Sequence, residues 1–138
     1  MLLNTEFISR LLKFGNLLSI FLINWESHNN SLLSSLKIFY STFIVIAVDE
    51  KKQKATGCSI DTLYNEIKKL EQLFKLDFLD SSILHLKINE KIKSIVFTEI
   101  QNIEDSNTLF FDTTIKKKKE IDNWLIPIKD GWCNAFIK

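Results

Sequence analysis

The uninterrupted apolar run FIVIAV at residues 43–48 limits the folds that are open to this chain. Most of its residues are β-branched, which favours an extended strand, and a strand without polar alternation is typical of one covered on both faces. The preceding segment has a similar composition. The sequence therefore predicts two strands, over about 35–40 and 42–48, with a tight turn near Tyr40–Ser41.

Two segments with helical periodicity flank this strand pair. Apolar residues recur at three- and four-residue steps over 5–25 and again over 60–74, which predicts a helix in each place. The apolar face of helix 5–25 is wider than one stripe. Such a helix is either buried on most sides or docks on a protein partner or on a second copy of the chain.

The second half of the chain is predicted to contain shorter elements. Alternation predicts a strand over 83–89, and β-propensity predicts another over 108–112. Short helices are predicted over 95–102 and 114–123, although SIVF within the first of these also favours a strand. The C-terminal tail is predicted to pack as an irregular arm. This order predicts an α+β fold in a single domain, residues 1–138, with a mainly antiparallel sheet and helices on one face.

Charge and composition bear on the class of partner. The formal net charge is +1, and Arg10 is the only arginine among 18 basic residues. Arginine is the preferred side chain for phosphate recognition, so nucleic-acid binding is not expected. The four lysines at 116–119 are interpreted as a solvated helix face.

The N-terminal region bears on location. MLLNTEFISR lacks the features of a signal peptide, because Glu6 comes before any basic residue and no small-residue cleavage site follows. Lys13 and Asn16 interrupt the apolar residues that come next, so no stretch approaches the ~20 residues of a membrane span. We therefore expect a cytoplasmic protein with no membrane span.

The two cysteines, Cys58 and Cys133, lie far apart and form no CxxC pair and no zinc-binding spacing. Reduced thiols are expected, and neither a metal nor a cofactor is predicted.

The segment GCSID, residues 57–61, contains the candidate site, and it permits three interpretations. In the first, Cys58 lies at the positive end of a helix dipole and acts as a nucleophile. It would need a base such as His28, since His28 and His85 are the only histidines, with Asp49 or Asp61 completing the group.

The second interpretation is structural and the third is a ligand site. Gly57 would supply a positive φ, Cys58 would be a small buried side chain, and Ser59 or Asp61 would cap the helix. Alternatively, the amides of residues 57–61 would bind a small anion or phosphate. The first hypothesis for function is a non-enzymatic binding module with any ligand near Cys58–Asp61, His28 and Asp49, and the alternative is a cysteine-dependent enzyme.

Five segments are distinctive when taken together in their order along the chain. They are NWESH (24–28), FIVIAVDE (43–50), GCSID (57–61), LEQLFKLDFLD (70–80) and NWLIPIKDGW (123–132). These segments, which extend from Asn24 to Trp132, resemble those of a family of short uncharacterised bacterial proteins that are often labelled "ABC transporter ATPase", and Gly-Cys-Ser-Ile-Asp is the most specific of them.

The resemblance implies a short strand before the first helix, which MLLNTE would form, and an element order like that of a ferredoxin-like core. Ser81 and Cys133 replace an arginine and a histidine that are usual in the family, so roles that depend on those residues are not expected here. ATP hydrolysis of the P-loop type is not expected either. It requires GxxxxGK[ST], and none of the three glycines precedes Lys-Ser or Lys-Thr.

Overall fold

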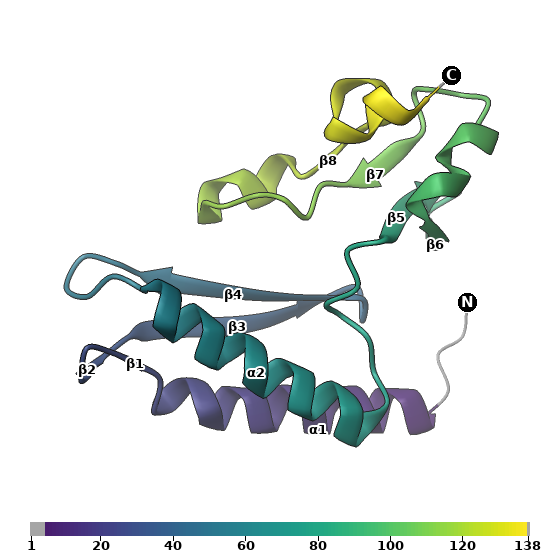
Figure 1. Cartoon of the computed structure of the whole chain (residues 1–138). Coiled ribbons are helices and arrows are strands. Elements are labelled where there is room, and N and C mark those ends of the chain that lie inside the picture. The colour runs from purple at the N-terminus through teal and green to yellow at the C-terminus, as the bar shows by residue number, and fades with distance from the viewer. Residues whose placement is uncertain (1–4, 138) are drawn as a thin grey trace. The chain divides into compact units, whose positions relative to one another are not determined.

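The computed structural model describes residues 5–137, and it confirms an α+β fold in which the paired strands are antiparallel (Figure 1). The chain divides into two compact units, the first ending at Leu79 and the second beginning at Asp80. The single domain and the ferredoxin-like core both stay predictions. Of the proposed N-terminal strand, residues 1–4 lie outside the described residues, while Thr5 and Glu6 belong to a helix.

The first unit contains two helices, two short hairpin strands and a longer hairpin. In Figure 1 both helices lie on one face of the longer hairpin, as predicted. The elements are α1 (Thr5–Ile23), β1 (Glu26–Ser27), β2 (Asn30–Ser31), β3 (Leu33–Phe39), β4 (Phe43–Asp49) and α2 (Gly57–Phe74).

The β3–β4 hairpin confirms the two predicted strands and the turn between them. Tyr40 and Ser41 adopt φ angles of 54° and 52°, and the Thr42 N–H donates to the Phe39 carbonyl at 2.9 Å. These left-handed residues match the twist of a tight hairpin. In the register of the pair, Leu36 lies opposite Ile46, and both pack toward the helices.

The two helices form a core with the inner face of this hairpin. Phe14 and Leu18 of α1 are fully buried and pack with Ile67 and Leu70 of α2. A Cβ on Gly15 would lie only 3.1 Å from the Ile38 Cδ1 atom, so the glycine allows α1 to approach β3 closely.

The second unit contains a four-stranded antiparallel sheet in the order β6-β5-β7-β8. Its core includes Leu86, Phe110, Ile128 and Cys133. The strands are β5 (Ile83–Ile88), β6 (Lys91–Val96), β7 (Leu109–Phe111) and β8 (Leu125–Pro127), and the 3-10 helices are η1 (Phe97–Asn102), η2 (Lys118–Asn123), η3 (Ile128–Asp130) and η4 (Trp132–Phe136).

The short elements of this unit differ from the prediction. The helix predicted over 95–102 begins only at Phe97, because residue Ile95 pairs with Leu84 and extends the hairpin. The helix predicted over 114–123 is a single 3-10 segment beginning at Lys118. The tail contributes edge strand β8, where Pro127 is tolerated because an edge strand has one side free of ladder bonds.

No helix within residues 5–137 is long and apolar enough to cross a membrane.

Candidate functional site

The N-terminus of α2 is held by a capping box that begins at Thr56. The Ser59 N–H donates to Thr56 Oγ1 at 3.3 Å, and the Thr56 N–H donates to Ser59 Oγ at 2.7 Å. The prediction that Ser59 or Asp61 caps the helix is therefore wrong. Thr56 is the N-cap and Ser59 is its reciprocal partner, while Asp61 is exposed.

Two further predictions at this junction are wrong because α2 begins three residues earlier than its periodicity indicated. Gly57 does not have a positive φ, and a Cβ there would meet no atom within 4 Å. Cys58 is exposed on the first turn instead of filling the core. Ser59 is the buried residue of this turn.

The β1–β2 hairpin lies beside this junction. The Trp25 indole Nε1–H donates to the Ser59 carbonyl at 2.8 Å, and the Ser27 hydroxyl donates to Thr56 Oγ1 at 3.1 Å. Trp25 is buried, as a core residue should be. These bonds satisfy polar groups that would otherwise be buried without partners, so they fix the hairpin against α2.

The three candidate catalytic side chains do not form a hydrogen-bonded group. His28 lies in the β1–β2 turn with φ 53° and is exposed. Asp49 Oδ1 accepts from the Lys51 N–H at 3.0 Å. Within residues 5–137, the Cys58 thiol bonds neither to the His28 imidazole nor to the Asp49 carboxylate. Catalysis by Cys58 stays a prediction.

An anion site at this helix start also stays a prediction. The Ser59 amide is already used by the capping box, and Gly57 and Cys58 are exposed. The amides of these two residues are left for water or an anion. The part of the chain that the structure describes holds no cluster of three or more His, Cys, Asp or Glu side chains that suits a metal ion.

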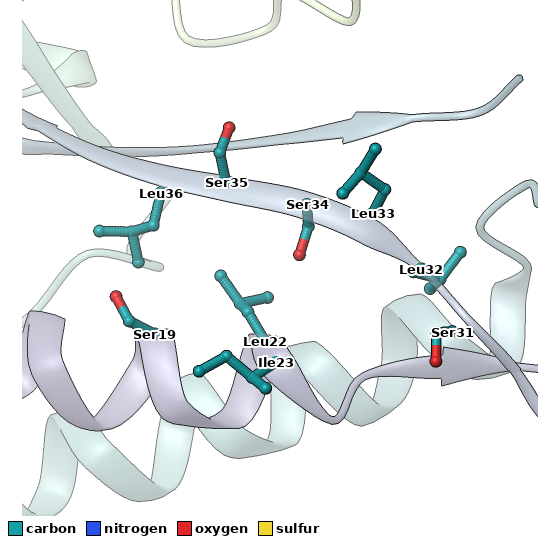
Figure 2. Close-up of a pocket in the computed structure, with 9 residues that line it drawn as sticks. All are labelled: Ser19, Leu22, Ile23, Ser31, Leu32, Leu33, Ser34, Ser35 and Leu36. Atoms are coloured by element: carbon teal, nitrogen blue, oxygen red, sulfur yellow. The ribbon is translucent and has the colours of Figure 1, made fainter.

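A groove of about 530 Å³ lies elsewhere in the first unit, between the C-terminal half of α1 and the start of β3 (Figure 2). Figure 2 shows the Ser34 side chain directed toward α1 and the Ser35 side chain directed the other way. The lining is uncharged and consists of Ser19, Leu22, Ile23, Ser31, Leu32, Leu33, Ser34, Ser35 and Leu36.

The groove continues onto an exposed apolar surface of α1. Ile23 is 77% exposed and Ile20 is 56% exposed, and Leu33 at the start of β3 is 69% exposed. Sequence reasoning indicated the wide apolar face of α1 but not the groove. No local pattern marked the groove, because its serines and leucines come from two separate elements.

In the second unit, one histidine is partly buried. The His85 Nδ1 atom lies 2.8 Å from the Ser94 hydroxyl, and burial lowers the pKa of this imidazole.

The lysine run at residues 116–119 is exposed, as predicted, but Lys116 and Lys117 precede the 3-10 helix, so the run is not a helix face. Glu120 accepts hydrogen bonds from the backbone N–H groups of Lys116 and Lys117, and these bonds lower the pKa of its carboxyl group.

Comparisons of the chain with protein-family models, with curated proteins and with solved structures found no match. The resemblance to the short bacterial family labelled "ABC transporter ATPase" therefore stays a prediction.

Proposed function

We propose that this protein is a non-enzymatic interaction module that binds another protein through the outer face of α1 and the adjoining groove. The observation that carries the proposal is the apolar surface exposed along α1. A single exposed leucine or isoleucine is ordinary, whereas α1 exposes five large apolar side chains along its 19 residues. The exposed apolar side chains of this helix are Ile8, Leu12, Leu17, Ile20 and Ile23.

The exposed face is distinct from the face that stabilises the fold. Phe14 and Leu18 point into the core and are fully buried, whereas Leu12 is 58% exposed on the other side of the same helix. Leu12, Ile20 and Ile23 leave more than half of their surface in water, so they contribute less to the folding of the first unit than the buried residues do. A binding function explains why these side chains are apolar, because the removal of apolar surface from water by a partner contributes favourably to the free energy of binding.

The alternative of a cysteine-dependent enzyme receives less support. The Cys58 thiol is exposed. However, the side chains that reach the junction from β1 and from the residue before it are Ser27 and Trp25, and both bind backbone or capping groups of α2. A nucleophilic cysteine requires an adjacent base, and the hydrogen bonds at this junction provide none.

The proposal is tested by photo-crosslinking. The full chain is produced in its host with p-benzoylphenylalanine in place of Leu12, and illumination is expected to give a discrete protein adduct. The matched control places the same residue at Asn65, an exposed position of α2. Equal adduct patterns at the two positions, or no adduct at position 12, would reject the proposal.

A further inference from the structure

The edge of β3 that faces away from β4 carries no strand within the described residues. The Phe39 carbonyl accepts from the Thr42 N–H and therefore points toward the β4 side of the hairpin. Backbone groups of an antiparallel strand alternate between its two edges. It follows that the backbone N–H and C=O groups of Ser35 and Lys37 also point toward β4. The backbone groups at the open edge therefore belong to Ser34, Leu36 and Ile38.

The β1 strand limits the length of this open edge. The Leu32 N–H donates to the Trp25 carbonyl at 3.0 Å. Leu32 precedes Ser34 by two residues, so its backbone groups point to the same edge, and Trp25 occupies that edge at the start of the strand. The edge that remains open runs from Ser34 to Ile38.

The groove beneath this edge defines what can occupy it. The Ser34 hydroxyl oxygen is buried and makes no hydrogen bond within residues 5–137, and Figure 2 shows it directed into the space beside α1. The wall formed by Ser19, Leu22 and Ile23 is uncharged. An added strand fits this edge, because it supplies main-chain hydrogen bonds to β3 and can direct uncharged side chains toward α1.

Charge distinguishes a partner strand from a second copy of the chain. Lys37 is exposed on the outer face of β3, and it makes no ion pair within the described residues. Two antiparallel copies can pair over the whole open edge in one register, in which Leu36 of one copy lies opposite Leu36 of the other. That register puts the two Lys37 side chains on the same face at diagonal positions, where like charges repel.

We therefore propose that the open edge of β3 binds an extended segment of a partner protein by antiparallel strand addition. The apolar side chains of that segment face α1, and acidic side chains on its other face lie near Lys37. The inference rests on the proposed interaction function, for which it names the class of partner and the mode of binding.

The test follows backbone amide exchange by NMR in the full chain. The probe is a short, acetylated and amidated peptide of alternating glutamate and isoleucine. On addition of saturating peptide, we expect the amides of Ser34, Leu36 and Ile38 to exchange at least about tenfold more slowly than in the free chain. The exchange rates of the Ser35 and Lys37 amides should not change. The same peptide with a central proline should not bind, because proline cannot donate to the ladder.

Charge-reversal variants test the chemistry of the occupant. The Lys37→Glu variant should lose affinity for the glutamate peptide and gain affinity for a lysine–isoleucine peptide. Lys52→Glu, on an exposed loop of the same unit, is the matched control and should keep the original preference. An unchanged preference in the Lys37→Glu variant would overturn the acidic assignment.

Two other results would overturn strand addition itself. In the first, the three amides keep their exchange rates in the presence of peptide. In the second, they are already slow in the free chain and its molar mass is twice 16.1 kDa, which would make a second copy the occupant. A persistent adduct to another protein at position 12 would show that the proposed function survives either failure.

Discussion

The Thr56→Ala substitution tests the junction that joins the β1–β2 hairpin to α2. Thr56 Oγ1 accepts from the Ser59 N–H at 3.3 Å and from the Ser27 hydroxyl at 3.1 Å. Loss of the helix cap costs about 1 kcal/mol. Ser27 is buried, and leaving its hydroxyl without a partner costs about 1 kcal/mol more. We therefore expect the free energy of unfolding to fall by about 2 kcal/mol.

Urea unfolding, monitored by circular dichroism and by tryptophan fluorescence, measures this change in the free energy of unfolding. Thr56→Ser retains the hydroxyl and should stay within about 0.5 kcal/mol of the wild type. In the Ser27→Ala background the cost of Thr56→Ala should shrink toward the cap contribution alone, since the shared bond is already lost. A loss below about 0.5 kcal/mol for Thr56→Ala would show that these two bonds do not hold the junction.

Three further predictions follow from individual residues. Iodoacetamide should modify Cys58 in the folded chain and Cys133 only after unfolding, since Cys133 is buried and burial raises the pKa of its thiol. Mass spectrometry of the labelled peptides measures this difference, and rapid labelling of Cys133 in the folded chain would contradict it. Gly57→Ala should stabilise the chain by about 0.5–1 kcal/mol in urea, because Gly57 lacks a positive φ and has space for a Cβ; a loss of stability would contradict the helix start described above. Burial lowers the pKa of His85, so the unfolded chain binds more protons, and the free energy of unfolding should fall as the pH drops below about 6.5. This pH dependence should flatten in the His85→Gln variant, and an unchanged profile of unfolding free energy against pH would refute the prediction.

The elements with long, regular patterns were predictable from the sequence. The β3–β4 hairpin and the two long helices follow from strand propensity and helical periodicity, which are local properties. The start of α2 was misplaced because Thr56-Gly57-Cys58 carries no apolar periodicity, and capping chemistry alone marks it. In the second unit, SIVF favoured a strand as well as a helix, and the pairing of β6 with β5, which is not a local property, decides for the strand up to Val96.

The candidate site was less predictable than the fold. The Ser27–Thr56 bond fixes the hairpin that contains His28 beside the start of α2, which no sequence pattern indicated, and the orientations of His28 and Cys58 depend on tertiary packing. The groove was not predictable, because α1 and β3 contribute its two walls from separate parts of the chain. The wide apolar face of α1 was the one sequence signal that pointed to this surface.

The most direct test of the binding surface combines photo-crosslinking with substitutions at its most exposed isoleucines. Ile20→Glu and Ile23→Glu are introduced together into the chain that carries p-benzoylphenylalanine in place of Leu12, and adduct yield and unfolding free energy are both measured. Because both isoleucines are mostly exposed, we expect the adduct to disappear while the free energy of unfolding changes by less than about 1 kcal/mol. An undiminished adduct in a stably folded double variant would contradict this expectation.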